Sequence, residues 1–352
     1  MKEIFLNTYI NSKLVSKDEK AKLIQYLKGE GCIYTRKSKN ISGLNCTRKD
    51  DNERLNIVFN NLETIFEGCS ILEYVERYDV NRNYKYSAIF KIKDYEAKKD
   101  MIQQNISENV EKIWELEDLS KYINSNDPEL LVMEDNLEYT VMKLNYIIGN
   151  VNNTMNIKYP VLCIIFKELG IIEIRLTGLN NQFKKIDNIY KYYFDSVIRK
   201  ITSRLKFEIG YINFRQISRR ILEEKRDNVT VYSQWMEGEF GSHARLRVAE
   251  DGDHYMLPIL GQLEKFIEEN DILKNNEDAK GAIRVFIDKV NSEHDFVRRA
   301  ICWLNDDNNI DYVVDFIHEY KGSQYSVLQN YFNNHDMEDM NDVTRNIISY
   351  ER

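Results

Sequence analysis

The sequence predicts an α+β protein, in which mixed strands, hairpins and helices are followed by an all-helical C-terminal region. Residues 84–93 alternate between apolar and mostly polar side chains, as expected for a half-buried strand. Residues 160–167 and 171–177 are apolar, β-branched runs joined by Glu168-Leu169-Gly170, which predicts a hairpin at the centre of a sheet. Beyond Gly252 the apolar spacing becomes helical.

The N-terminal region begins with a well-defined helix start. Ser16 and Glu19 have the spacing of a capping box, in which the serine oxygen accepts a backbone N–H and the glutamate reaches back to the cap. A break is expected before Pro128, because proline disfavours helix at the preceding residue. The other predicted N-terminal elements are strands at 55–59, 62–66 and 71–75 and a helix at 107–123.

The central region is predicted to end in two helices and a hairpin. Residues 137–148 are ambiguous, since their apolar positions also fit a helix. Helices are expected at 188–205 and 213–225, and a hairpin from 229–236 and 243–249. The predicted C-terminal helices lie near 259–269, 279–290, 293–304, 310–320, 323–332 and 338–349. The resulting domains are 1–127, 128–252 and 253–352.

Charge is unevenly distributed along the 352 residues. The net charge is −8, but residues 151–230 carry 15 basic and 8 acidic side chains, whereas residues 231–352 carry 12 and 24. The overall sign argues against uniform coating of nucleic acid or of an anionic membrane. The basic middle is compatible with a confined anion-binding surface.

Cysteine usage and hydropathy indicate the cellular environment. The five cysteines include no C-x-x-C pair, so a cysteine zinc site is not expected. The first residues lack the apolar stretch of a secretory leader, and no apolar run reaches the roughly 20 residues that cross a bilayer. We therefore expect a cytoplasmic protein with reduced thiols and no membrane partner.

A basic stretch from Lys184 to Val248 is the main candidate for a binding surface. Its order of helix, turn, helix and hairpin resembles a winged helix-turn-helix, in which a helix enters the major groove and the hairpin touches the backbone. Glu223, Glu224 and Asp227 lie among the arginines and could neutralise them instead. The side chains predicted to contact nucleic acid are Lys200, Arg204, Arg215, Arg219, Arg220, Lys225, Arg226, His243, Arg245 and Arg247.

A second candidate is a metal site in the C-terminal third. His254 follows an aspartate-rich turn, and His294-Asp295 begins a predicted helix. This order is similar to the outline of the HD phosphohydrolases, in which a His-Asp pair binds a divalent metal that activates water. The alternative is that Asp295 only interacts with the helix dipole. Later aspartates in this outline are Asp311, Asp315 and Asp336.

A third candidate is a nuclease site of the two-carboxylate and lysine type. Glu173-Ile174-Arg175 lies on a predicted strand, with arginine where such sites carry lysine, and Lys167 and Glu168 lie near the partner strand. The alternative is an ion pair on the sheet surface. The sequence has no P-loop, G-x-G-x-x-G, G-x-S-x-G or H-E-x-x-H motif, and no cofactor is predicted.

These observations favour a non-enzymatic binding protein. Abundant Asn, Ile, Lys and Tyr are usual for AT-rich bacterial or phage genomes, so a mobile-element origin and a role in phage defence are compatible with the composition. The basic centre would engage DNA or RNA, and the acidic end would engage a protein partner or a second copy through Phe296, Ile301 and Trp303. The alternatives are a metal-dependent nuclease or phosphohydrolase, and an accessory subunit that binds protein alone.

Overall fold

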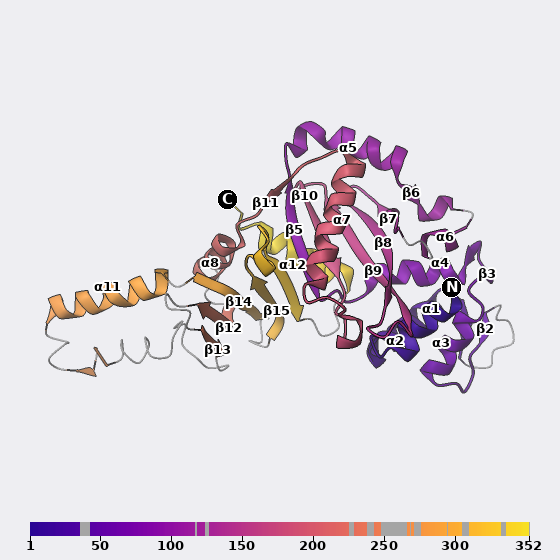
Figure 1. Cartoon of the computed structure of the whole chain (residues 1–352), viewed down its shortest axis with the longest axis horizontal. Coiled ribbons are helices and arrows are strands. Elements are labelled where there is room, and N and C mark those ends of the chain that lie inside the picture. Colours follow the sequence, from indigo (N-terminus) through magenta and orange to yellow (C-terminus); the bar gives the residue numbers. More distant parts are fainter. Residues whose placement is uncertain are drawn as a thin grey trace. The chain divides into compact units, whose positions relative to one another are not determined.

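The computed structural model confirms the α+β class and divides the chain into two compact units (Figure 1). Unit 1 contains Met1–Tyr211 and Asn334–Arg345, and unit 2 contains Ile212–Asn333 and Asn346–Arg352. For residues 236–237, 243–247, 286–293, 295–296 and 310, only the backbone is described. The structure describes all residues except 36–42, 117, 124–126, 225–228, 238–242, 248–265, 268, 271–275, 294, 305–309, 332–335 and 352.

Unit 1 is built on a twisted sheet in which β8, β9 and β10 are central. The predicted hairpin is confirmed: β9 pairs with β10 antiparallel, and its long apolar run is buried. The ambiguous segment 137–148 is strand β8, which pairs with β9 along its whole length. The described strands are, in spatial order, β5 (Tyr86–Ile92), β10 (Ile171–Leu176), β9 (Asn156–Phe166), β8 (Tyr139–Gly149), β7 (Leu131–Asp135) and β6 (Glu111–Lys112), and β11 (Ile209–Tyr211) also pairs with β5.

Helices cover both faces of this sheet. The ring of Tyr193 of α7 packs against those of Tyr146 and Tyr159, which are register partners and so share one face. The side chain of Lys158 points to the opposite face of the sheet, towards the N-terminal helices. Among these, α1 and the π-helical turn that follows it pack on β9. The helices of unit 1 are α1 (Lys2–Leu6), α2 (Lys17–Gly29), α3 (Asp51–Phe59), α4 (Ile71–Tyr78), α5 (Tyr95–Asn109), α6 (Ser120–Ile123) and α7 (Ile189–Leu205).

The sequence predicts the start of α2 correctly, but it predicts strands in two later segments that are helical. The capping box is confirmed, because the Ser16 oxygen accepts from the Glu19 N–H and the Glu19 carboxylate accepts from the Ser16 N–H. The predicted strands at 55–59 and 71–75 are wrong, since both runs belong to helices α3 and α4. Asp50 and Ser70 cap these helices, and such caps can outweigh the β-propensity of a short apolar run.

The strands of unit 2 pair with one another in antiparallel fashion. Helix α8 packs on β12, β14 and β15 and places Phe214, Ile217 and Ile221 against them. The predicted helix at 279–290 is confirmed as α11 (Glu277–Glu293). The described strands of this unit are, in spatial order, β13 (His243–Arg247), β12 (Val229–Glu237), β14 (Asp295–Leu304), β15 (Ile310–Ile317) and β16 (Val327–Tyr331), and α8 spans Phe214–Glu224.

The prediction of an all-helical C-terminal region is wrong. The segments 293–304, 310–320 and 323–332 form β14, β15 and β16, and segment 259–269 lies almost entirely outside the described residues. Both β14 and β15 are rich in β-branched and aromatic residues, which favour strands. Their buried residues lie on both faces of the sheet, so the apolar runs are nearly continuous and the period of two is lost.

The last helix, α12 (Met337–Ile348), is present as predicted, but the chain division runs through it. Its residues up to Arg345 belong to unit 1 and those from Asn346 to unit 2. The domain boundary predicted between residues 127 and 128 falls inside unit 1. Strand β5 lies before this point in the chain and β10 after it, and the two strands pair with each other.

Candidate functional site

The predicted cations are distributed between the two units. Lys200 and Arg204 lie on α7 of unit 1, where each already has a local partner. Lys200 Nζ is 2.6 Å from Asp127 Oδ1 and donates to the Pro128 carbonyl. Arg204 Nε donates to the Asn109 carbonyl at 2.8 Å. These contacts link α7 to neighbouring segments.

The other predicted helical cations lie on α8 of unit 2. The apolar face of α8 is buried, and the ring of Phe214 packs at a tilt against Phe316 of β15, with ring centroids 6.1 Å apart. Arg220 donates to the Tyr350 carbonyl. Arg215 is 3.3 Å from Glu319, and Arg219, one turn further along, is exposed.

Two further basic residues, Arg299 and a neutral His318, lie on the sheet beneath α8. Arg299 is the register partner of Phe316, and His318 follows Phe316 by two residues on the same face. Burial and the charge of Arg219 lower the pKa of Arg299 to about 10. Burial, Arg215 and Arg299 lower the pKa of His318 to about 3. Positive charge is therefore concentrated around α8, at a site that the sequence identified only through Arg215 and Arg219.

The buried imidazole of His318 makes the stability of unit 2 dependent on pH. An unfolded histidine takes up a proton near pH 6.5, but folded His318 stays neutral down to about pH 3. Its contribution to stability is therefore complete above pH 6.5 and is lost as pH falls from 6.5 towards 3. We expect this group to add a slope of up to about 1.4 kcal/mol per pH unit to the free energy of unfolding.

Denaturant unfolding at several pH values measures this slope. His318→Gln removes the titrating group and can still hydrogen bond to Ser326, whose Oγ is 3.1 Å from Nδ1 in the parent protein. The variant should have a flatter dependence on pH between 3 and 6.5. Identical slopes for parent and variant would show that His318 is not the group responsible.

The predicted hairpin is present, although its side chains are described in part only. Strand β13 pairs with β12 so that Arg245 lies opposite Trp235 and Arg247 opposite Ser233, and His243 pairs with Glu237. The side chains of His243, Arg245 and Arg247, together with Lys225, Arg226 and Asp227, lie outside the described residues.

This topology differs from the expected helix-turn-helix order. Helices α7 and α8 belong to different units, and strand β11 separates them in the chain. The hairpin also continues into a wider sheet through β14. Within unit 2, α8 and the hairpin are the remaining parts of the expected binding surface.

No family model matches the chain, and no curated protein matches it. Its function therefore has to be argued from its own side chains.

The metal candidate in the C-terminal third is visible only in part. His254 and His294 lie outside the described residues, as does the side chain of Asp295. Asp315 pairs with Arg298 at 2.5 Å and so belongs to an ion pair. Elsewhere in the described part of the chain, no group of three or more His, Cys, Asp or Glu side chains is placed to hold a metal ion.

The proposed nuclease residues form a buried ion pair. Arg175 Nη2 is 2.8 Å from Glu173 Oε2 and also donates to Asn341, and Thr344 donates to the same glutamate. Both charged side chains are buried. The pair is thus held by α12, and Lys167 lies separately beside Asp135.

Sequence reasoning missed the most concentrated charge in unit 1. Glu76 at the end of α4 and Asp79 just after it face Lys143 of β8 and Lys158 of β9, and all four side chains are fully buried. We call these four residues the ion cluster. Lys158 Nζ lies 2.5 Å from both Glu76 Oε1 and Asp79 Oδ2, and Lys143 Nζ lies 2.5 Å from Glu76 Oε2.

The positive and negative charges of the ion cluster neutralise one another. Burial disfavours the charged form of Asp79, but Lys158, Lys143 and Arg82 outweigh this effect and hold its pKa below the ordinary value. Burial likewise disfavours ionised Glu76, and Lys143 and Lys158 keep its pKa low. A metal ion would have to displace an ammonium group, so the cluster serves folding better than metal binding.

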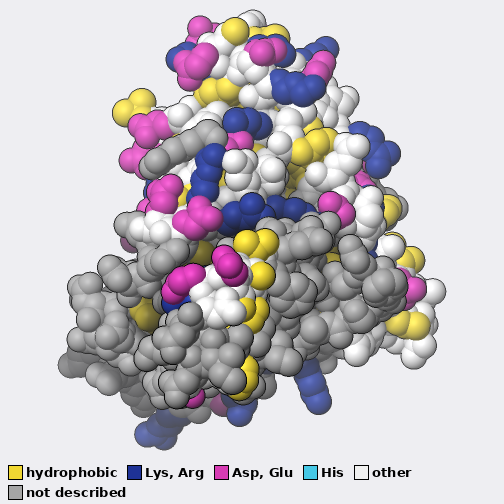
Figure 2. Space-filling view, turned by 90° about the vertical axis from the view of Figure 1, so that its left-hand side faces the viewer, with side chains coloured by type: hydrophobic (Ala, Val, Ile, Leu, Met, Phe, Trp, Pro, Cys, Tyr) yellow, Lys and Arg dark blue, Asp and Glu magenta, His cyan; other side chains and the backbone are white. Residues whose placement is uncertain are grey.

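Surface features bear on the predicted partners. Among the described residues, no helix is long and apolar enough to cross a membrane. Figure 2 shows lysine and arginine side chains interspersed with acidic ones over the described surface of one face. Ile301 and Trp303, which were expected to be exposed interface anchors, are buried instead, and the side chain of Phe296 is not described.

Proposed function

We propose that the protein binds nucleic acid without catalysing a reaction, through α8 and the β12–β13 hairpin of unit 2. The observation that carries this proposal is the concentration of Arg215, Arg219 and Arg299 at α8, which lowers the pKa of Arg299 and of His318 beyond the effect of burial. A group whose charged form is disfavoured by neighbouring cations is stabilised in that form when an anion enters. Guanidinium groups fit phosphate oxygens well, because they donate two parallel hydrogen bonds.

The hairpin extends this surface. Trp235 is 39% exposed on β12 and is the register partner of Arg245. Aromatic side chains next to cations stack on unpaired bases with little sequence preference. Phosphate contacts also carry no sequence information, so we expect binding that depends on salt much more than on base sequence.

A charge-reversal variant tests this proposal. Arg219→Glu combined with Arg245→Glu should weaken binding to short fluorescent DNA and RNA oligonucleotides, measured by anisotropy at low salt. The slope of log affinity against log salt should shrink by about 0.7–0.9 for each phosphate contact removed. The thermal midpoint should change little, because Arg219 is exposed.

A matched control carries the same charge change elsewhere. Arg199 on α7 and Lys28 on α2 are both exposed in unit 1, so Arg199→Glu combined with Lys28→Glu should leave the affinity nearly intact. If the parent protein bound no nucleic acid at low salt, or if both double variants behaved alike, the proposal would be wrong. The protein-binding accessory subunit would then be the better hypothesis.

A further inference from the structure

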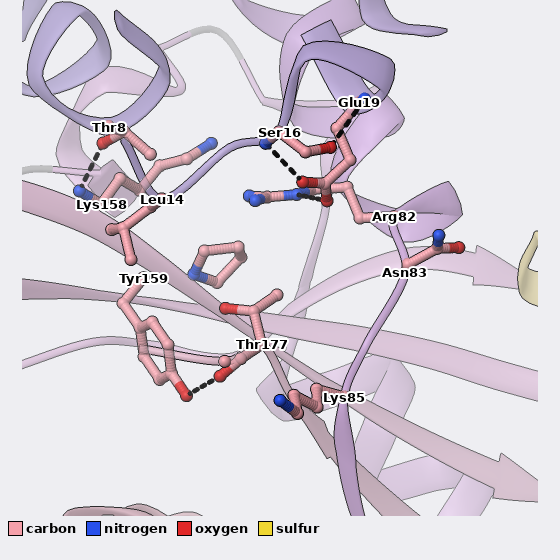
Figure 3. Close-up of a pocket in the computed structure, with 12 residues that line it drawn as sticks. Thr8, Leu14, Ser16, Glu19, Arg82, Asn83, Lys85, Lys158, Tyr159 and Thr177 are labelled. Atoms are coloured by element: carbon pink, nitrogen blue, oxygen red, sulfur yellow. Dashed lines mark hydrogen bonds and ion pairs between the residues drawn. The ribbon is translucent and has the colours of Figure 1, made fainter. Parts of the chain in front are cut away.

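A pocket of about 270 Å³ opens in unit 1 beside the ion cluster (Figure 3). Ser16 and Glu19, at the beginning of α2, form one part of its wall, and Tyr159 and Pro160 of β9 form another. Arg82 and Lys85, from the segment between α4 and β5, complete the charged side. The pocket therefore shares no residue with α8 or with the surface proposed for nucleic acid.

Arg82 is the unusual residue of this pocket. Its side chain is 95% buried, with 5% exposed, and its guanidinium lies over the ring of Tyr9 at 5.5 Å. Within the described residues, Nε has no hydrogen-bond partner: a carboxylate oxygen of Glu19 is 3.9 Å away, beyond hydrogen-bond distance. Figure 3 shows the guanidinium pointing into the pocket beside Glu19. A buried charged N–H without an acceptor is unfavourable, so this atom indicates a missing oxygen ligand.

The charges around the pocket favour an anion. Arg82 and the two lysines of the ion cluster are balanced by Glu76, Asp79 and Glu19, which together carry three negative charges. Lys85 is exposed at the rim of the pocket. Its positive charge is additional to these three balanced pairs of charges. The N-terminus of α2 adds the positive end of a thirteen-residue helix dipole.

The rest of the lining limits the size and character of the ligand. The volume of about 270 Å³ limits the ligand to a small molecule. That volume fits a phosphate with a short polyol or a single sugar, and it lies below the usual range for larger ligands. Leu14, Tyr159 and Pro160 offer apolar contact, and Thr177 offers a hydroxyl group.

We propose that this pocket binds a small organic phosphate of about the size of a sugar phosphate. The phosphate lies between Arg82 and Lys85, where one oxygen accepts from Arg82 Nε, and the carbon skeleton lies against Tyr159 and Pro160. A phosphate is favoured over a neutral sugar because the two cations supply charge-assisted hydrogen bonds that only an anion accepts.

Calorimetric titration of the whole protein tests the proposal with ribose 5-phosphate, glucose 6-phosphate and glycerol 3-phosphate. At least one should bind and raise the thermal midpoint, ribose should do neither, and inorganic phosphate should bind more weakly than the best ester. If no ester bound, the proposal would be overturned. Equal affinity for inorganic phosphate would exclude recognition of the organic part.

Variants locate the binding site. Arg82→Gln can fail to fold, because Arg82 Nη1 also donates to Asp79 at 3.5 Å. Lys85→Glu is therefore the main variant, and it should reduce affinity at least tenfold while leaving the thermal midpoint of the unliganded protein unchanged. Lys91→Glu, an equal charge change at an exposed position of β5, is the control. Equal losses in both variants, or no loss in Lys85→Glu, would place the ligand elsewhere.

Discussion

Lys158→Met should destabilise unit 1 by about 3–5 kcal/mol and lower its thermal midpoint by roughly 10 °C. Methionine preserves most of the volume and removes the charge, so Glu76 and Asp79 would remain buried with only one ammonium group close to both. An uncompensated charge in a fully buried cluster is much more costly than a lost surface pair. Thermal or denaturant unfolding measures the change, and Trp114 reports on unit 1 once Trp235 and Trp303 are replaced by Phe in both proteins.

Two comparisons show whether charge is the cause. Lys28→Met removes an exposed lysine of α2 and should change the stability by no more than about 0.5 kcal/mol. Lys158→Met combined with Glu76→Gln restores charge balance, because Lys143 remains 3.2 Å from Asp79. The double variant should therefore lose less stability than Lys158→Met alone. Strictly additive losses would contradict an electrostatic origin.

Phe316→Ala should destabilise unit 2 by about 3–5 kcal/mol, which is the usual cost of removing a buried aromatic ring. The ring of Phe316 is fully buried and lies next to Phe214 of α8 and His318. Its removal therefore leaves a cavity where α8 packs on the sheet. Trp235 and Trp303 both belong to unit 2, and their fluorescence follows its unfolding in denaturant.

A control for Phe316→Ala is available in the same unit. Val285 of α11 is 67% exposed, so Val285→Ala should change the stability by less than about 0.5 kcal/mol. A loss below about 1 kcal/mol for Phe316→Ala would mean that α8 is not held by this ring. Because Arg215 and Arg219 are carried by α8, the same variant should also weaken any binding of nucleic acid that they mediate.

The sequence predicted an element correctly where the signal lies within a few residues. The capping box at Ser16 is present, and the segment 84–93 contains the predicted strand, β5, although residues 87–90 are all buried and the strand is not half-exposed as expected. The hairpin at 160–177 was predictable because its turn is short and its strands are long and apolar. Helix α8 was predictable from its strongly amphipathic spacing.

The failures involve elements whose environment is set by distant residues. Residues 310–317 have apolar positions that fit a helix, and only pairing with β14 and β16 makes them a strand. The ion cluster was missed because 71–75 was assigned to a strand, which separated Glu76 and Asp79 from their shared helical turn. A visible indication was Lys158 standing alone in an apolar run, since a lysine there needs a buried partner. That partner is 79 residues away in sequence.

The division of α12 between the units has a consequence for the order in which the protein can fold during synthesis. Unit 1 includes Asn334–Arg345, which the ribosome makes only after nearly all of unit 2. Until then the buried Glu173 and Arg175 lack Thr344 and Asn341, which are their hydrogen-bond partners on this helix. The nascent N-terminal part can therefore collapse early, but the hydrogen bonds of its buried Glu173 and Arg175 to α12 cannot yet form. Unit 1 can therefore close only after residues 334–345 have left the ribosome.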